Sequence, residues 1–160
     1  MKKAIFLDRD GVINKEIGGW VFRSEDFEIN KDVTEALEIL KGKGFIFIVV
    51  TNQSGIAKGI YKTEDVEFLH QKMNRILLES GILIKEIFFC PHHDETGKCL
   101  CRKPDSLMLE KAIAKYEIDV SKSYLIGDKD RDIEAASRVG VKGLLIEPNS
   151  SVLGIAGMIS

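Results

Sequence analysis

The chain has 160 residues, enough for one ordinary domain with a substantial core, and we expect residues 1–160 to form a single domain. Its 23 basic and 25 acidic residues give a formal net charge of −2, which leaves no basic field to recruit nucleic acid. No apolar run reaches membrane-spanning length, and Met1-Lys2-Lys3 leads into a short apolar run instead of a signal-peptide core. We therefore expect a cytoplasmic monomer that binds neither a membrane nor nucleic acid.

The first apolar segment ends in two carboxylates. Residues 4–7 form a short apolar run without alternation, which predicts a strand buried on both faces, and Asp8, Asp10 and Gly11 follow it. Side chains two positions apart on a strand point the same way, so Asp8 and Asp10 would repel unless a cation or a proton lay between them. The pair is a candidate for metal binding, nucleophilic attack or acid/base chemistry. A strand end with Asp as turn former or helix cap is the alternative.

A long connection reaches to about residue 31 and contains Trp20 next to two glycines. Trp20 suits either an aromatic flap over a ligand or a packing anchor, and the pattern does not separate the two. A helix is predicted from Asp32 to about residue 42, followed by an apolar strand over 45–50. That strand also ends in polar residues, from Thr51 to Gly55.

The second half continues the alternation of helices and strands. We predict a helix over 64–80 with Thr63 as its N-cap, and then a strand over 86–89. His70 on this helix has no partner at metal spacing, so we expect it on the exposed surface. After a polar loop the pattern predicts elements at 106–116 (helix), 123–126 (strand), 131–139 (helix) and 143–146 (strand). The tail from Pro148 is weakly patterned.

This alternation predicts an α/β fold: a parallel sheet with helices on both faces, in three layers. Ligands of such sheets bind at the carboxyl ends of the strands. Asp8, Asp10, Thr51 and Asp128 all follow apolar strands directly. The fold would therefore gather them at one edge of the sheet, which favours a functional site over a simple turn at Asp8 and Asp10.

The residue types at this edge suit phosphate chemistry. Carboxylates of Asp8 and Asp128, with the backbone carbonyl of Asp10, are oxygen ligands of the kind that Mg²⁺ takes. Asp8 would attack phosphorus to form an aspartyl-phosphate, and Asp10 would act as general acid and base. Asp130 and Asp132 suit a helix cap better than a metal site. The candidate phosphate-binding residues are Thr51, Asn52, Gln53, Arg102 and Lys103.

The loop before Arg102 contains a second cluster. Cys90, His92, Cys99 and Cys101 supply three thiolates and one imidazole, a full tetrahedral set for structural Zn²⁺. A redox pair of Cys99 and Cys101 is the alternative, but it leaves Cys90 and His92 unexplained. His93 is a possible substitute ligand. The zinc would stiffen the loop that delivers Arg102 and Lys103 to the phosphate.

Four motifs carry a resemblance to the phosphatases of the haloacid dehalogenase (HAD) superfamily. They are Asp8-Arg9-Asp10-Gly11, Thr51-Asn52-Gln53-Ser54-Gly55, Arg102-Lys103-Pro104 and Gly127-Asp128-Lys129. The resemblance covers nearly the whole chain and implies a Rossmann-like sheet of order 5-4-1-2-3 without a large cap domain. It also implies Asp8 as nucleophile, Asp10 as acid/base, Thr51 and Lys103 as phosphate binders and Asp128 as Mg²⁺ ligand. The zinc loop is similar to that of the histidinol-phosphatase and heptose-bisphosphate phosphatase group.

The loops of this group point to two substrates. The Thr51–Gly59 segment resembles the enzymes that remove the 7-phosphate of D-glycero-D-manno-heptose 1,7-bisphosphate, and the short span between His92 and Cys99 resembles the histidinol-phosphatases. We expect the heptose activity, because the first match lies beside the reacting phosphate, with Arg102 contacting the retained phosphate or sugar. A non-catalytic receiver-like phosphoacceptor is the alternative from another class; it has no need of Asp10 or of a zinc loop.

Overall fold

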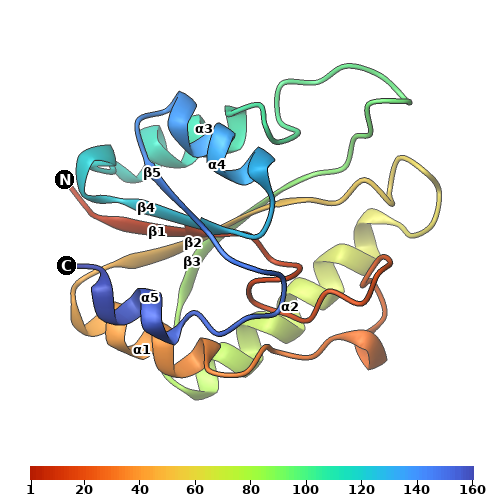
Figure 1. Cartoon of the computed structure of the whole chain (residues 1–160). Coiled ribbons are helices and arrows are strands. Elements are labelled where there is room, and N and C mark those ends of the chain that lie inside the picture. The colour runs from red at the N-terminus through yellow and green to blue at the C-terminus, as the bar shows by residue number, and fades with distance from the viewer.

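The computed structural model describes residues 1–160 and has a five-stranded parallel sheet at its centre. The strand order is β3-β2-β1-β4-β5, which confirms the predicted order read from the opposite edge. Figure 1 shows the strands running together through the middle of the molecule. The strands are β1 (Ala4–Leu7), β2 (Ile46–Asn52), β3 (Ile84–Cys90), β4 (Tyr124–Gly127) and β5 (Lys142–Leu145).

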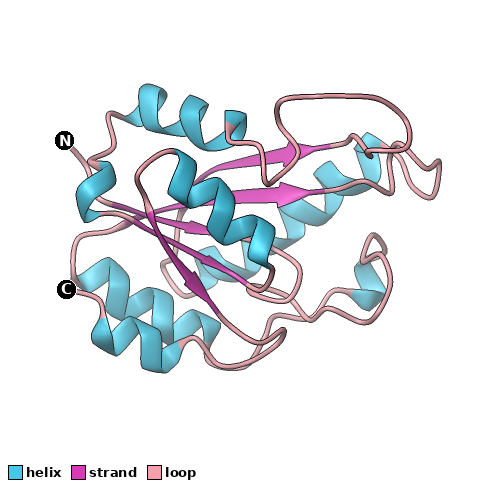
Figure 2. Ribbon diagram, turned by 45° about the horizontal axis from the view of Figure 1, so that its top comes forward, coloured by secondary structure: helices cyan, strands magenta, loops and turns pink.

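Helices cover both faces of the sheet, as the three-layer prediction requires (Figures 1 and 2). One face carries α3 and α4, and the other carries α1, α2 and α5. No cap-sized domain interrupts the alternation of strands and helices. The helices are α1 (Val33–Gly42), α2 (Thr63–Glu79), α3 (Leu107–Tyr116), α4 (Asp130–Arg138) and α5 (Leu153–Met158), with short 3₁₀ turns at Ser24–Asp26 and Val120–Lys122. None of the helices is long and apolar enough to cross a membrane.

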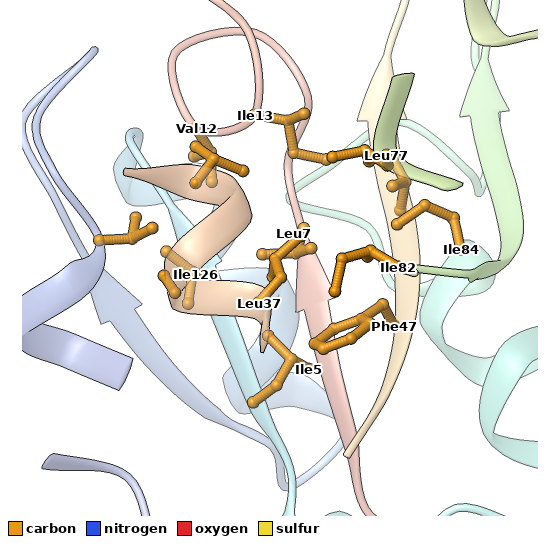
Figure 3. Packing of buried hydrophobic residues seen from close by; sticks show 14 of the residues in the cluster. Ile5, Leu7, Val12, Ile13, Leu37, Phe47, Leu77, Ile82, Ile84 and Ile126 are labelled. Carbon is orange, nitrogen blue, oxygen red and sulfur yellow. The ribbon is translucent and has the colours of Figure 1, made fainter. Parts of the chain in front are cut away.

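The apolar runs of the central strands follow from this layering. Ile5 and Leu7 of β1 pack into the core under α1 and α2, whereas Phe6 packs into the core under α3 and α4. Figure 3 shows Ile5 and Leu7 beside Leu37 and Phe47. Because successive side chains of a strand enter opposite cores, every position must be apolar and no alternation can appear.

Three sequence expectations need correction at the ends of elements. The helix predicted over 64–80 begins at Thr63, so its N-cap is Lys62 and not Thr63. The third strand begins at Ile84 instead of residue 86, since Ile84 already pairs with Phe47 ahead of a register shift in β2. The weakly patterned tail contains α5, which packs against α1; Ala156 of this helix and Ile159 just after it are buried in the core. Its six residues are too few to display a helical period, so only the packing reveals it.

Candidate active site

The register of the sheet places Asp8 between two neighbouring strands at their carboxyl ends. Leu7 of β1 is in register with Val49 of β2 and Ile126 of β4. The Asp8 N–H then donates to the Ile126 carbonyl, 3.1 Å away. Asp128 follows β4 directly, so the two carboxylates meet at one edge although 120 positions separate them in the chain.

Three carboxylates form what we call the aspartate cluster: Asp8, Asp128 and Asp132. They offer oxygen atoms within 4.8 Å of one another, and all three residues are buried. Both side-chain oxygens of Asp128 are buried without a hydrogen-bond partner. A hard divalent cation would satisfy these orphaned acceptors, so the donor set fits Mg²⁺.

Glycines make this cluster possible by leaving room for it. Gly11 has φ +86°, and a Cβ there would lie 2.1 Å from Asp128 Oδ2. A Cβ on Gly127 would lie 2.3 Å from the Cβ of Asp132. Any side chain at either position would displace a carboxylate of the cluster.

Lys103 is the cation inside the cluster and is only 2% exposed. Its Nζ lies 3.1 Å from Asp8 Oδ1 and 2.6 Å from Asp132 Oδ1, and it donates to the Val50 carbonyl at 2.8 Å. The ammonium therefore contacts three oxygen atoms, two of which belong to carboxylates. Burial alone would lower the pKa of Lys103, but the carboxylates of Asp8 and Asp132 outweigh it and raise that pKa. The ammonium is therefore held charged against the carboxylate of Asp8.

Asp8 itself is in an environment that opposes its charge. Burial raises the pKa of Asp8 to about 7 against the lowering effect of Lys103, and Asp132 and Asp128 raise it further. Burial, followed by the charge of Asp132, also raises the pKa of Asp128. The cluster carries more negative charge than one lysine neutralises, and a bound cation would remove this imbalance.

Asp132 is a site residue that the sequence patterns assigned to helix capping alone. Its Oδ2 does accept the N–H of Lys129 at 3.1 Å, as a cap residue would. Its Oδ1 faces Lys103, and the residue is 0% exposed. The signal in the sequence was its spacing of four residues from Asp128, which places Asp128 just before α4 and Asp132 in its first turn.

The second-strand motif supports Asp10 and Lys103. Gln53 Nε2 donates to Asp10 Oδ2 at 3.1 Å and to Thr51 Oγ1 at 3.0 Å. The Asn52 side chain brackets the backbone of Lys103, accepting its N–H at 3.0 Å and donating to its carbonyl at 3.2 Å. The amides of Asn52 and Gln53, predicted to bind phosphate, are thus already engaged in holding other site residues. The phosphate-binding role of Thr51, Asn52 and Gln53 stays a prediction.

A pocket of about 160 Å³ opens over these residues, and only one of its 12 lining residues is hydrophobic, which suits a charged ligand. Trp20 lines it and is 41% exposed, with Lys58 Nζ 5.7 Å from the ring centre. A packing anchor would be buried, so the exposed position of Trp20 beside the pocket favours the interpretation as an aromatic flap. The full lining is Asp8, Asp10, Glu16, Gly19, Trp20, Thr51, Asn52, Gln53, Ser54, Asp128, Lys129 and Arg131.

Arg102 is not among the residues that line this pocket, and its predicted contact with the substrate stays a prediction. Its Nε is 3.4 Å from Asp94 Oδ1, and its Nη1 donates to the His92 carbonyl at 3.4 Å. Lys129 and Arg131 are the cations that line the pocket instead, and the sequence patterns missed both.

The second cluster, which we call the cysteine cluster, consists of Cys90, His92, Cys99 and Cys101. Its ligand atoms also lie within 4.8 Å of one another. Cys90 Sγ is 3.7 Å from Cys99 Sγ, close to the edge of about 3.8 Å of a tetrahedral zinc–thiolate site, and 2.8 Å from Cys101 Sγ, which is shorter than that edge. His92 Nδ1 lies 3.3 Å from Cys101 Sγ. The four residues fit a Zn²⁺ ion with no open position. His93 is not part of the cluster and instead accepts the N–H of Glu95 through Nδ1.

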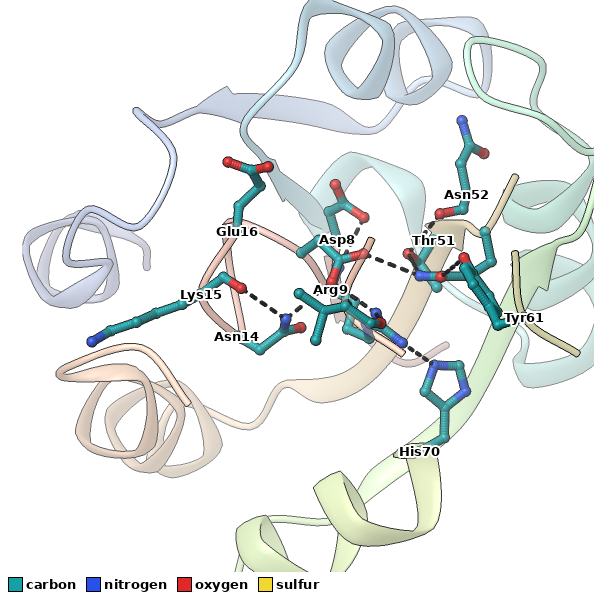
Figure 4. Close-up of polar contacts among 12 residues, drawn as sticks. Asp8, Arg9, Asn14, Lys15, Glu16, Thr51, Asn52, Tyr61 and His70 are labelled. Carbon is teal, nitrogen blue, oxygen red and sulfur yellow. Dashed lines mark hydrogen bonds and ion pairs between the residues drawn. The ribbon is translucent and has the colours of Figure 1, made fainter. Parts of the chain in front are cut away.

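His70 is buried at 6% exposure, which overturns the expectation of a surface histidine. Its Nε2 lies 3.2 Å from Arg9 Nη1 (Figure 4). It shares the buried face of α2 with Val66 and Met73, at spacings of four and three residues. That helical spacing was the signal in the sequence; the missing metal partner was not evidence of exposure.

Comparison with known proteins agrees with this site. The HAD-hydrolase-like family model matches residues 100–151. D-glycero-alpha-D-manno-heptose-1,7-bisphosphate 7-phosphatase of Photorhabdus laumondii is 41% identical over 87% of this chain and 79% of its own length. The chain belongs to this family of HAD phosphatases. The Haemophilus ducreyi relative, named for the beta anomer, is 42% identical over 88% of this chain and 80% of its own length.

Solved structures confirm the HAD fold. The D,D-heptose 1,7-bisphosphate phosphatase of B. bronchiseptica, complexed with magnesium and phosphate, has a TM-score of 0.83 and 34% identity. It matches over 89% of this chain and 79% of its own chain. The superfamily, its fold and the activity class of phosphoric monoester hydrolase are therefore confirmed.

Proposed function

We propose that this HAD phosphatase removes the 7-phosphate of D-glycero-D-manno-heptose 1,7-bisphosphate with Mg²⁺ bound at the aspartate cluster. The observation that carries the proposal is the contact of Asp8, which lines the polar pocket, with the buried Lys103, beside the unpartnered oxygens of Asp128. The names of relatives about 40% identical over most of the chain support the substrate.

Asp8 and Asp10 divide the chemistry of the two displacements. A carboxylate oxygen of Asp8 attacks phosphorus, the bond from phosphorus to the sugar oxygen breaks, and Asp10 donates its proton to that oxygen. A water molecule then attacks the aspartyl-phosphate, gives its proton to Asp10 and releases phosphate, which regenerates the carboxylate of Asp8. Lys103, already in contact with Asp8, offsets the negative charge of the phosphoryl group.

Mg²⁺ would be held by the carboxylates of Asp8 and Asp128 and the backbone carbonyl of Asp10, where it supplies charge to the phosphoryl oxygens. Zn²⁺ in the cysteine cluster would be structural, because all four positions of a tetrahedron are taken by the protein. The zinc loop leads directly into Arg102 and Lys103, so its order bears on the placement of Lys103.

The test is a substrate comparison in the presence of Mg²⁺. Purified protein is incubated with each anomer of the heptose bisphosphate, with histidinol phosphate and with an aryl phosphate, and released phosphate is measured. We expect the highest kcat/KM with a heptose bisphosphate, and phosphorus NMR of the product should show the 1-phosphate retained. Both anomers are needed because relatives of similar identity carry both names.

The controls separate the two other candidate functions. Histidinol phosphate is included because the short span between His92 and Cys99 resembles that branch, and a higher kcat/KM with it would replace the heptose assignment. A stable phosphoprotein without turnover would replace the enzyme with a receiver-like phosphoacceptor. Asp8→Asn serves as the inactive control for contaminating phosphatase activity.

A further inference from the structure

His70 lies outside the pocket lining but points toward the active site from α2 (Figure 4). It is 6% exposed, and its ring packs edge-on against Phe89 of β3 with the ring centres 5.9 Å apart. Its polar contact is with Arg9, the residue between the two aspartates of the first motif. The buried imidazole of His70 therefore links α2 to the Asp8-Arg9-Asp10-Gly11 motif.

The chemistry of the contact determines the state of the ring. A guanidinium only donates hydrogen bonds, so Nε2 of His70 must be the acceptor and the imidazole must be neutral. Burial, followed by the charge of Arg9, lowers the pKa of His70 to about 3, which agrees with a neutral ring. His70 therefore fixes one donor of Arg9 without adding a charge to the site.

Arg9 is 0% exposed and is held from three sides. Nη1 meets His70, and Nη2 donates to the Val21 carbonyl at 2.7 Å. Nη2 and Nε both donate to Oδ1 of Asp10, at 2.8 and 3.2 Å. His70 and the Val21 carbonyl thus fix the orientation of the guanidinium. In that orientation two of its nitrogens donate to one oxygen of Asp10, Oδ1.

The two oxygens of Asp10 are consequently unlike. Oδ1 accepts from Arg9 and also from Asn14 Nδ2 at 3.0 Å. Oδ2 accepts one bond, from Gln53 at 3.1 Å, and Gln53 is itself held by the Tyr61 hydroxyl at 2.6 Å. Asp10 remains 28% exposed and lines the pocket. Oδ2 is therefore the oxygen with a lone pair left to carry the proton of a general acid.

We propose that His70 is a positioning residue for the phosphatase reaction, which holds Arg9 against Oδ1 of Asp10 and so presents Oδ2 to the leaving oxygen of the substrate. The inference rests on the proposed role of Asp10 as general acid. His70 touches neither the substrate nor the reacting atoms; it acts through Arg9. A purely structural histidine of the core is the competing explanation.

The leaving group distinguishes these explanations. A sugar oxygen must receive a proton as its bond to phosphorus breaks, whereas a dinitrophenolate leaves without one. A misplaced Asp10 therefore slows the first step with a sugar phosphate and spares it with 2,4-dinitrophenyl phosphate. A general loss of folding or of Mg²⁺ binding lowers both rates alike. The quantity to compare is kcat/KM, which reports steps up to the first irreversible one.

The experiment compares His70→Leu, His70→Gln, Asp10→Asn and the control Met73→Leu with the unaltered protein. Gln retains an acceptor near the position of Nε2, and Met73 lies one turn further along the buried face of α2. For His70→Leu we expect kcat/KM with heptose bisphosphate to fall by roughly tenfold or more and that with the aryl ester by less than about threefold. His70→Gln should recover most of the loss, and Met73→Leu should alter neither rate.

Equal losses with both esters, or no loss with either, would overturn the role of His70. If His70→Leu does not fold, His70→Met, which fills a similar volume without a nitrogen acceptor, replaces it. Failure of the proposed function is seen separately: the unaltered protein would then hydrolyse neither ester, or Asp10→Asn would lower both rates alike. If Asp10→Asn shows the difference between esters and the His70 variants do not, the positioning inference alone is wrong.

Discussion

The aspartate cluster and the cysteine cluster are both sets of metal-ligand side chains, but the fold builds them in opposite ways. Asp8, Asp128 and Asp132 come from both ends of the chain and are buried at strand and helix ends. The cysteine cluster lies within residues 90–101, in a loop whose His92 is exposed. Strand and helix ends position the first cluster, whereas three of the four residues of the second lie in a loop outside any helix or strand, so we expect that loop to depend on its own metal ligands for order. Magnesium should therefore matter mainly for activity, and zinc mainly for stability.

The largest expected effect is a loss of activity that leaves the zinc content unchanged, which would distinguish the roles of the two clusters. Asp8→Asn removes the proposed nucleophile, so we expect kcat to fall by at least about 1000-fold. The cysteine cluster is untouched, and one zinc per chain should remain, as measured by atomic emission. Retained turnover would contradict the assignment of Asp8.

Asp132→Asn tests whether the whole aspartate cluster acts as one unit. Loss of this charge leaves Lys103 paired with Asp8 alone, which should weaken the apparent affinity for Mg²⁺ by roughly 10-fold to 100-fold. Activity is measured over a Mg²⁺ titration. Asp130→Asn, an exposed residue of the same helix, is the matched control and should behave as the unaltered protein. Equal Mg²⁺ dependence in both variants would show that Asp132 acts only as a cap.

Cys99→Ser tests the cysteine cluster in the same manner. We expect loss of zinc, a fall in the melting temperature of roughly 5 °C or more, and a partial fall in activity, because the loop leads into Lys103. His93→Ala, in the same loop but outside the cluster, should keep the zinc and the stability. A Cys99→Ser variant that keeps both its zinc and its melting temperature would exclude the structural zinc site.

The smallest expected effect concerns His70 and its contact with Arg9, next to the aspartate cluster. The pKa of His70 is about 3 in the folded protein and near its ordinary value of 6.5 when unfolded, so between these values the unfolded state binds the extra proton. Stability conferred by neutral His70 is thus full above pH 6.5 and is lost as the pH falls.

His70→Gln cannot take up that proton. Relative to this variant, the unaltered protein should lose roughly 1 kcal/mol of unfolding free energy per pH unit below pH 6.5. Urea denaturation at pH 7, 6 and 5 measures the difference. Parallel pH dependence of the two proteins would show that folding does not lower the pKa of His70.

The same contrast explains which parts of the site were predictable. The cysteine cluster is visible as a spacing of Cys and His, because its members are neighbours in sequence. The common position of Asp8, Asp10 and Asp128 was predictable because parallel strands place their carboxyl ends together. This placement does not depend on the side-chain contacts that form there. Asp132, Lys129, Arg131 and the burial of His70 were missed, since they depend on how helices pack against that edge.

The sequence by itself determined the alternation of strands and helices, the buried central strands and the two groups of metal-ligand residue types, because all of these are local patterns of apolar, charged and sulfur-containing side chains. The tertiary structure decided which polar atoms are satisfied. It turned Arg102 toward Asp94, placed Lys103 between two carboxylates and buried His70 against Arg9. These contacts join residues far apart in the chain, and their partners are selected by packing and desolvation, which no local pattern records.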